Sequence, residues 1–468
     1  MQTGEVSSEA SSTPDGVTAD STTPTPPTPT PRRLPLYALY AANAISRVGD
    51  VLTLLALPWF TLQTTGSLAK TGLVGFCATI AVAFTAFFGG ALVDRVGFRR
   101  VSVVSDLVSA VCVGLVPLLY FTVGLRFWQL LVLVFLAGLG TTPGSTARSA
   151  LVPDLAELAN ARLERVSAAT DGISRIATFF GAPLAGVLIA LIGASNLLWV
   201  DAATFAISAA LIGALVPRLA QHTAPAAEPT AAVIGDVASG VVSDGSPNDG
   251  QAPPQARRAT DGGMFAGLRF ILADSLILSL IVTVLVTNLL DSGFAAVLAP
   301  AYIRQVFHSA VIWGAMIAGF GGTAFLGTVV FGAIGHRLPR RLSLGVGFTL
   351  AGGTRFIALA LIPFPALLVA INTVAGFFIG PVNPLFDTIS YERVPAALRA
   401  RVFGVTTAGA TIGIPLGALL SGYLGVWLGL RTTLIVLGAI YIAMTASLLV
   451  NPATRHMERP QPSDNEAV

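Results

Sequence analysis

Three polar residues lie at helical spacing inside an apolar stretch near the N-terminus: Asn43, Arg47 and Asp50. Positions i, i+4 and i+7 share one face of a helix, so the three side chains are expected to point the same way. An ionisable group at the centre of a bilayer costs at least about 2.5–3.5 kcal/mol, so such groups normally face a partner or a water-filled path. We therefore expect Asp50 to take up and release a proton while Arg47 keeps it ionised. The alternative is a permanent Arg47–Asp50 pair that only holds the helix in place.

A second polar stripe, in a later apolar run, combines Thr283, Thr287 and Asp291 at i, i+4 and i+8, with Asn288 alongside. The same helical spacing predicts one face that could contact a small molecule. We expect Asp291 to lie toward the outer end of its span, where a solvated residue at the mouth of a path is the alternative interpretation.

Two further polar positions interrupt apolar runs. Asn383 stands between Pro381 and Pro384, where a helix is expected to bend, and this position could serve a cargo or only the bend. Arg355 has no carboxylate nearby in the sequence, so Asp106 or Asp201 is the expected partner.

Several kinds of chemistry are excluded by the residues themselves. The single lysine, Lys70, follows Ala69, so no phosphate-binding loop of the Gly-Lys-Ser/Thr type exists. The four histidines have no metal-ligand spacing, and no nucleophile and base are arranged for catalysis. No basic stripe is interleaved with aromatic residues, so nucleic-acid binding is not expected. The sequence predicts no enzyme and no cofactor, and what remains is transport powered by an ion gradient or a passive carrier.

The composition identifies the elements that must position these residues. With 54% apolar and only 11% charged residues, the chain carries more apolar surface than a soluble protein could bury. A helix needs roughly 20 apolar residues to cross about 30 Å of hydrocarbon. Twelve such runs are expected, near 36–61, 69–92, 101–123, 127–149, 166–192, 195–216, 272–299, 311–335, 342–363, 365–388, 402–427 and 430–450.

The distribution of basic residues predicts the orientation. The first thirty residues hold no apolar stretch, so no cleavable signal peptide is expected and the N-terminus should stay inside. With this orientation most arginines, Arg148 among them, fall on the inner side, because basic residues favour retained loops. The outer side keeps Lys70, Arg126, Arg304 and Arg431.

The two halves of the chain repeat each other. GALVDRVGFRR begins at residue 90 and GAIGHRLPRR begins at residue 332, 242 positions later, and each follows an apolar run. Pro58 and Val152 recur at the same offset as Pro300 and Val394. A duplication of six spans explains these matches.

The first copy resembles the signature loop of the major facilitator superfamily, through Gly90, Leu92, Asp94, Arg95, Gly97 and Arg99. The second copy is degenerate and keeps Gly332, Arg337 and Arg341, with His336 where Asp94 would fall. The resemblance implies an all-α membrane protein of the major facilitator fold, with twelve transmembrane helices in a 6+6 arrangement. It also implies that spans one, four, seven and ten line a central path, and that Asp94 gates transport by binding the N-terminus of span eleven.

Further residues are similar to the macrolide-efflux and enterobactin-exporter branch: Val394-Pro395 with Arg399 to Gly404, and Gly267 to Phe270. This resemblance implies export driven by the proton gradient. We expect a secondary active transporter that exports small amphipathic compounds by alternating access, as a proton antiporter. The alternatives are a siderophore or narrow metabolite exporter and, from another class, a non-transporting membrane scaffold or sensor with the same fold.

The expected domain organisation follows from composition. Residues 1–33 are expected to be a disordered cytoplasmic tail, 34–218 and 265–452 the two six-helix bundles, 219–264 a disordered cytoplasmic linker and 453–468 a cytoplasmic tail. The expected partners are a small-molecule substrate, protons and the lipid bilayer. The expected location is the bacterial plasma membrane, with a monomer whose two termini are both cytoplasmic.

Overall fold

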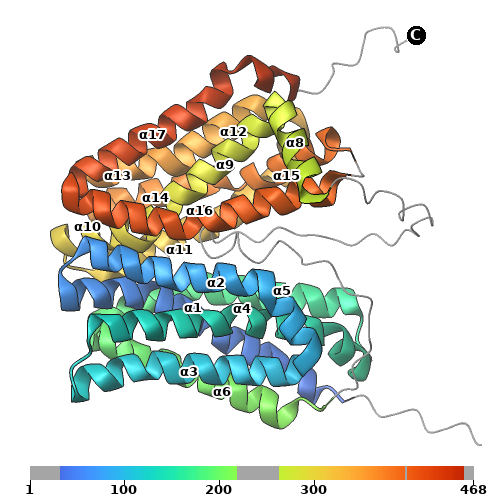
Figure 1. The fold of residues 1–468 in the computed structure, drawn as a ribbon, viewed down its shortest axis with the longest axis vertical. Coiled ribbons are helices and arrows are strands. Elements are labelled where there is room, and N and C mark those ends of the chain that lie inside the picture. The colour runs from blue at the N-terminus through green and yellow to red at the C-terminus, as the bar shows by residue number, and fades with distance from the viewer. Residues whose placement is uncertain (1–31, 219–262, 396–397, 458–468) are drawn as a thin grey trace, which may run out of the picture.

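A computed structural model describes residues 32–218, 263–395 and 398–457 of the chain (Figure 1). Within these ranges, the side chains of 86–92, 94, 95, 263–266, 455 and 456 are outside the description. The tail expected at 1–33 and the linker expected at 219–264 fall almost wholly outside the described residues, as does most of the tail at 453–468.

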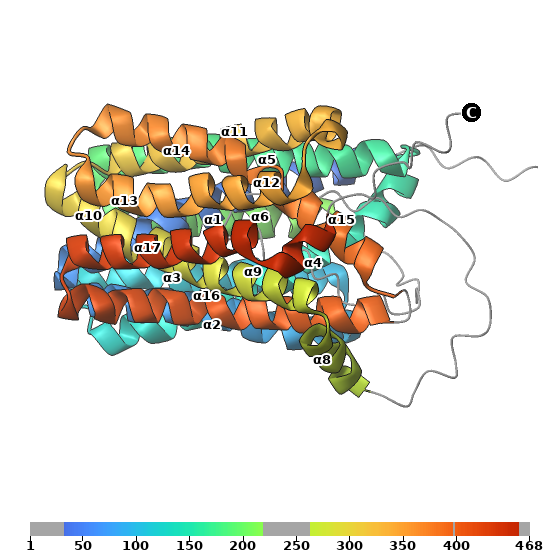
Figure 2. The same cartoon turned by 90° about the horizontal axis from the view of Figure 1, so that it is seen from above.

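The first half of the chain forms six long helices. They are α1 (Leu34–Thr65), α2 (Leu68–Val96), α3 (Phe98–Thr122), α4 (Phe127–Leu158), α5 (Leu163–Ile192) and α6 (Ala194–Leu215). Four of the turns that join helices in the protein use a glycine with positive φ, at Gly66, Gly124, Gly193 and Gly429. These turns lie at one end of the bundle, here called the distal end. The opposite, proximal end carries the start of α1, the end of α6 and the beginning of the second half of the chain (Figure 2).

The second half begins with the short helix α8 (Gly263–Ala273) and continues in broken spans. They comprise α9 (Ser275–Gly293), η3 (Phe294–Leu298), α10 (Ala299–Val306), α11 (Ala310–Ile334), η4 (Gly335–Arg337), α12 (Arg340–Phe348), η5 (Thr349–Gly353), α13 (Thr354–Leu361), α14 (Pro365–Ile379), α15 (Val382–Arg393), α16 (Arg399–Trp427), α17 (Leu430–Val450) and η7 (Pro452–Met457). Both π-type turns, η3 and η5, lie inside a span, and the tenth span breaks at Gly380–Pro381, where a bend was predicted.

Twelve helical segments are long and apolar enough to cross a bilayer, six in each half. The described residues contain no strand. The predicted fold class, all-α with twelve membrane helices, is therefore confirmed. One boundary differs in a way that matters below: α4 runs on to Leu158, beyond the predicted end at 149, because residues 151–152 and 155–156 keep an apolar face buried in the bundle.

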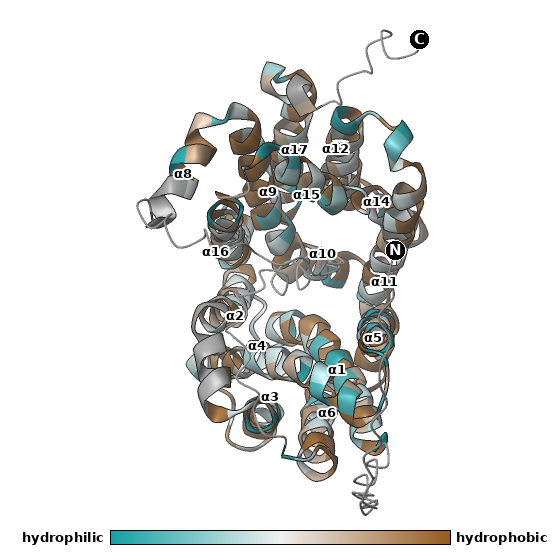
Figure 3. Ribbon diagram, turned by 90° about the vertical axis from the view of Figure 1, so that its right-hand side faces the viewer, coloured by the Kyte–Doolittle hydropathy of each residue, from teal (hydrophilic) through white to brown (hydrophobic). Residues whose placement is uncertain are grey.

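The two halves meet along two helix pairs, α2 with α16 and α5 with α11 (Figure 3). Small residues permit the close approach at the distal end. A Cβ on Gly72 would lie 2.6 Å from the Ala418 carbonyl oxygen, and a Cβ on Gly314 would lie 2.5 Å from that of Ala182. In membranes, where apolar surface alone does not drive association, such contacts allow helices to pack backbone to backbone.

Arg304 adds a polar contact between the halves. Its guanidinium donates a hydrogen bond to the Leu62 carbonyl in the last turn of α1. The last carbonyls of a helix have no partner within the helix and carry a partial negative charge, so an arginine there is favourable. The contacts between the halves extend from this distal end to the middle of α5 and α11, where the Arg175 guanidinium lies 5.6 Å from the Phe325 ring centroid.

Candidate functional site

A buried ion pair joins four helices of the first half. Arg148 of α4 donates to both carboxylate oxygens of Asp106 of α3, at 2.9 and 3.0 Å. Ser208 of α6 donates to the same carboxylate at 2.6 Å, and the other amino group of Arg148 donates to Ser46 of α1 at 3.1 Å. Both charged side chains are only 4% exposed. A paired, hydrogen-bonded geometry of this kind is what offsets the cost of removing two charges from water.

The sequence analysis missed this network for a specific reason. Arg148 was counted only among the basic residues of the inner side, at the end of a fourth span predicted to stop at 149, and Asp106 was offered as a partner for Arg355. The span end and the partner are both wrong: α4 continues for ten residues past Arg148, and Asp106 pairs with Arg148. The available signal was Asp106 itself, an unpaired carboxylate in an apolar run that required a cation somewhere.

Arg47 and Asp50 lie close together on α1, as the spacing predicted. The Arg47 Nη1 to Asp50 Oδ2 distance is 4.0 Å, and the two side chains are 32% and 23% exposed. Asn43 is buried and donates to Ser174 of α5 at 3.0 Å, so it fastens α1 to α5. The two charged residues therefore remain loosely paired and accessible, whereas Asn43 is occupied by a neighbouring helix.

A further carboxylate, Asp201 of α6, is fully buried beside α1. Thr53 of α1 donates a hydrogen bond to it, and Thr204 donates a second at 3.2 Å. Gly49 makes room for this contact, because a Cβ there would lie 2.5 Å from Asp201 Oδ1. Asp201 was the other partner suggested for Arg355, which is wrong as well: it binds hydroxyl groups of the first half.

The second half holds its own ion pair, at a different place in the repeat. Arg355 of α13 donates to Asp291 of α9 at 2.6 Å, and the Tyr441 hydroxyl of α17 donates to the other carboxylate oxygen at 3.1 Å. The Arg355 guanidinium also lies 4.3 Å from the centroid of the Phe320 ring and 5.2 Å from that of Phe294. Such cation–π contacts stabilise a desolvated guanidinium.

The expected position of Asp291 near the outer end of its span is wrong. The seventh span runs from Ser275 through the π-type turn to Val306, so Asp291 lies in its middle. The seventh span was predicted to end near 299, whereas it continues to Val306; Pro300 occupies the first turn of α10, where a proline is tolerated.

The other predicted polar positions are only partly brought together. Thr283 and Thr287 are buried and donate to carbonyls of their own helix at 2.8 and 2.9 Å. Asn288 is half-buried on α9, and Asn383 is half-buried on α15, just after the break at Pro381. The two threonines therefore contribute little polar surface to a path.

The predicted gating motif falls largely on side chains outside the description, namely those of Gly90, Leu92, Asp94 and Arg95. Its last two members are described. Gly97 has a φ of 96° and joins α2 to α3, a conformation that glycine adopts without strain. Arg99 donates to the Gly213 carbonyl in the last turn of α6.

The second motif repeats this contact. Arg341, 242 positions after Arg99, donates to the Leu448 carbonyl at 3.2 Å and also to that of Leu449, both in the last turn of α17. Each arginine thus stabilises the C-terminal end of the sixth helix of its half. Gly332 is exposed near the end of α11, and Arg337 is exposed beside His336.

Arg340 was missed by the sequence analysis and is the buried member of the arginine pair. It binds both oxygens of Glu392 on α15, at 2.5 and 2.8 Å. The adjacent arginines of this motif therefore diverge, one toward α15 and one toward α17.

Twelve membrane-crossing helices in two related halves, with ion pairs in the middle of the spans, define a multi-pass membrane transporter. The family model described as Major Facilitator Superfamily matches residues 39–291 and 280–467. The chain belongs to this superfamily. Membership confirms the predicted fold, its repeat and a transporter that is not an enzyme, and it implies a small-molecule substrate and a bilayer environment.

Named relatives extend the comparison. The multidrug efflux pump Tap of Mycobacterium tuberculosis is 28% identical over 430 residues, which cover 91% of this chain and 95% of that protein. Tap of Mycolicibacterium fortuitum is 28% identical and is covered to 98%. The macrolide efflux protein A of Streptococcus pyogenes is 26% identical over 127 residues, 26% of this chain and 30% of that protein. The predicted resemblance to the macrolide-efflux branch is thereby confirmed.

Solved structures show the same fold. A bacterial homologue of the human lysosomal transporter Spinster, in an inward-facing and unoccupied conformation, has a TM-score of 0.66 at 14% identity over 93% of this chain and 100% of that chain. The nucleoside transporter NupG has a TM-score of 0.64 at 16% identity over 89% of this chain and 98% of that chain.

Proposed function

We propose that the protein exports small amphipathic compounds, drugs or secondary metabolites, in exchange for protons. Its similarity to a multidrug efflux pump over 91% of the chain supports the direction and the kind of cargo. The observation that carries the coupling is the loose, accessible Arg47–Asp50 pair on α1. A group that must gain and lose a proton in each cycle needs access to water and a pairing weak enough to be broken.

Asp50 is the proton carrier in this proposal. Ionised, it is attracted to Arg47 across 4.0 Å; protonated, it loses that attraction and Arg47 becomes free to reorient. The contrast with Asp106 supports the assignment, because that carboxylate is buried and is held by three hydrogen bonds, two of them from an arginine.

The cargo would lie between the halves, near residues from spans one, seven and ten. We assign the contacts with cargo or proton to Asn43, Arg47, Asn288, Asp291 and Asn383. Thr287 contributes indirectly, through a hydrogen bond with the Tyr441 side chain. Asp291 takes part through Arg355: a cargo that competes for the Phe320 ring or for the carboxylate would loosen that pair. Ion pairs that rearrange between two states are suited to alternating access.

The topology belongs to the same proposal. Both termini and the linker at 219–264 are assigned to the cytoplasm of a bacterial cell, and the chain to a monomer in the plasma membrane with bundles at 34–218 and 265–452. The distal end, where Arg304 binds the Leu62 carbonyl, is then extracellular. Asp94 is proposed to gate the cycle from the cytoplasmic side by binding the N-terminus of α16.

The test is uptake of a fluorescent lipophilic cation into inverted vesicles with an imposed proton gradient. Wild type is expected to accumulate the dye until an uncoupler is added, whereas Asp50→Asn and Asp94→Ala are expected to lose accumulation at unchanged membrane abundance. Asp154→Asn, the same chemical change at a half-buried carboxylate near the proximal end of α4, serves as the matched control. Uncoupler-sensitive uptake by Asp50→Asn at the wild-type level would rule out the coupling role. Failure of wild type to accumulate any of a panel of drugs would favour a narrow metabolite or siderophore cargo.

A further inference from the structure

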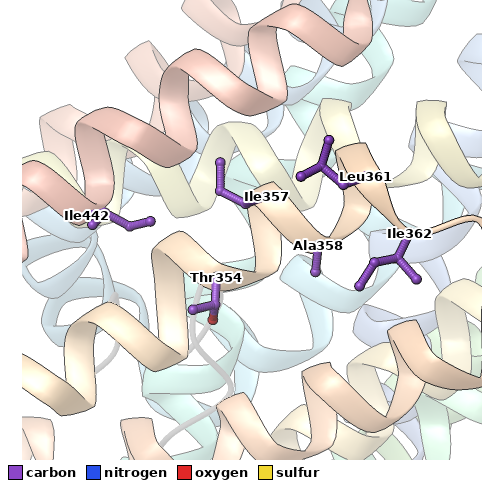
Figure 4. A pocket seen from close by; sticks show the side chains of 6 residues that line it. All are labelled: Thr354, Ile357, Ala358, Leu361, Ile362 and Ile442. Atoms are coloured by element: carbon purple, nitrogen blue, oxygen red, sulfur yellow. The ribbon is translucent and has the colours of Figure 1, made fainter.

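An apolar groove lies on the outside of the second half, between α13 and α17 (Figure 4). It encloses about 300 Å³ and is lined by Thr354, Ile357, Ala358 and Leu361 of α13, by Ile362 just after it, and by Ile442 of α17. Ile357 and Leu361 lie on the side of α13 away from Arg355 and Leu359, which point into the bundle, and Leu361 is 52% exposed. The groove therefore opens away from the transport path.

The groove extends toward the distal membrane surface. From Thr354 to Ile362 the helix rises about 12 Å, close to the roughly 15 Å depth of one leaflet's hydrocarbon. At the distal end of the bundle, Trp427, the last residue of α16, is 81% exposed, as tryptophans are at a membrane–water interface. The groove thus runs along the direction in which a lipid chain lies, starting at headgroup level.

A cation stands at this headgroup level. Arg431, in the first turn of α17, is exposed, and its Nε donates to the Ala360 carbonyl at 3.0 Å. This bond fixes the guanidinium beside Leu361, the last residue of α13. No described residue forms a hydrogen bond or ion pair with its two terminal amino groups, which keeps four N–H donors available in the planar arrangement that suits a phosphate.

We propose that this groove is a binding site for one anionic phospholipid, with the phosphate on Arg431 and an acyl chain along α13. An apolar surface on a membrane-spanning protein is covered by lipid in any case; the positioned arginine selects an anionic headgroup among the available lipids. The floor of the groove depends on Ala358, whose small side chain leaves the space that a chain would fill. Neither cargo nor proton is involved, so the site is independent of the export function.

Native mass spectrometry of the full-length protein, released from detergent with phosphatidylglycerol and phosphatidylcholine at equal concentration, tests the site. Wild type is expected to retain one phosphatidylglycerol in preference to phosphatidylcholine. Arg431→Gln should lower that preference about fivefold, the factor expected for one arginine at an anionic surface. Arg431→Lys should keep most of it, and Ala358→Phe should remove retention of the lipid by filling the groove.

Arg126→Gln is the matched control, because Arg126 is an exposed arginine at the same end of the bundle, away from the groove. Its preference should equal that of wild type. Equal retention of the two lipids by wild type would mean acyl contact alone and would overturn the proposal. An equal loss in Arg126→Gln and Arg431→Gln would assign the preference to overall surface charge and overturn it as well. Arg431→Lys and Ala358→Phe decide the outcome should Arg431→Gln fail to fold.

Discussion

The two halves share their helices but not their buried charges. In the first half, Asp106 and Arg148 join spans three and four, each with 4% of the side chain exposed. In the second half, Asp291 and Arg355 join spans seven and nine, with 19% and 10% exposed. A duplication copies the apolar pattern that folds a bundle, whereas each half places its ion pair independently.

The difference also concerns how completely each pair is satisfied. Asp106 accepts three hydrogen bonds and Arg148 reaches a third helix through Ser46. Asp291 accepts one bond from Arg355 and one from Tyr441, and the remainder of the guanidinium lies against aromatic rings. The Nε of each arginine is buried without a hydrogen-bond partner among the described residues, so the two pairs differ in the number of bonds to neighbouring helices. The pair with more such bonds resists rearrangement, and the pair with fewer can exchange partners. The comparison therefore predicts a rigid first-half pair and an adjustable second-half pair.

The largest effect is expected from breaking the first-half pair. Arg148→Met leaves Asp106 buried without its cation and should lower the free energy of unfolding in detergent by about 3–5 kcal/mol. The double variant Asp106→Leu with Arg148→Met removes both charges and should recover most of this loss. A loss of less than about 1 kcal/mol in the free energy of unfolding of Arg148→Met would contradict the prediction that the first-half pair is rigid.

Breaking the second-half pair should cost less. Arg355→Met leaves Asp291 with the Tyr441 bond and some access to solvent, so a loss of about 1–3 kcal/mol is expected in the same unfolding measurement. Tyr441→Phe removes one hydrogen bond and should cost about 0.5–1.5 kcal/mol. The comparison fails if Arg355→Met destabilises the protein as much as Arg148→Met.

The arginines that end the sixth and twelfth spans should behave alike, because both halves use the same contact. Arg99→Gln and Arg341→Gln each remove a cation from the last turn of a helix, and each should lower stability by about 0.3–1 kcal/mol. Arg337→Gln, at an exposed neighbour, is the control and should stay within about 0.5 kcal/mol of wild type. Thermal unfolding of the three variants side by side shows whether the repeat extends to this contact. Clearly unequal losses of stability in Arg99→Gln and Arg341→Gln would contradict the prediction that the two contacts are equivalent.

The smallest effect is expected at an ion pair outside the membrane core. Asp274 caps α9 and accepts a hydrogen bond from Arg393 at 2.8 Å. Burial raises the pKa of the Asp274 carboxyl, but the bonds from Arg393 and from two backbone N–H groups lower it by more. The net effect is a pKa below the ordinary value of 3.8. The charged form is therefore favoured by folding, so this stabilisation is present above about pH 4 and is lost as the pH falls below it. Asp274→Asn keeps a capping side chain and should cost less than about 0.5 kcal/mol at neutral pH.

Unfolding measured from pH 7 to pH 3 checks the sign. The difference between wild type and Asp274→Asn should shrink as the pH falls. A difference that grows on acidification would mean that folding favours the protonated carboxyl, against the assignment.

The repeat and the twelve spans could be predicted because they depend on local composition. An apolar run of roughly 20 residues is a membrane helix almost regardless of its neighbours, and the 242-residue offset located Arg341 as the counterpart of Arg99. The proximity of Arg47 and Asp50 was also predictable, since residues three apart on a helix are neighbours.

Partners on different helices could not be predicted in the same way. Arg355 was assigned to Asp106 or Asp201, and it binds Asp291, which lies 64 positions away in the sequence. The choice depends on how α9, α13 and α17 pack and on the π-type turns that shift the register of two of these spans. The end of the fourth span could not be predicted for the same reason. The helix α4 continues to Leu158 because of packing that hydropathy alone does not reveal.

The sequence by itself determined that this chain is a membrane protein of two related six-helix halves, because apolar length and the period of polar residues are properties of single segments. The tertiary structure alone decided which charges neutralise each other: Asp106 with Arg148, Asp291 with Arg355 and, loosely, Arg47 with Asp50. The physical reason is that a charge in a bilayer must find a partner within a few ångströms, and that distance is set by helix packing.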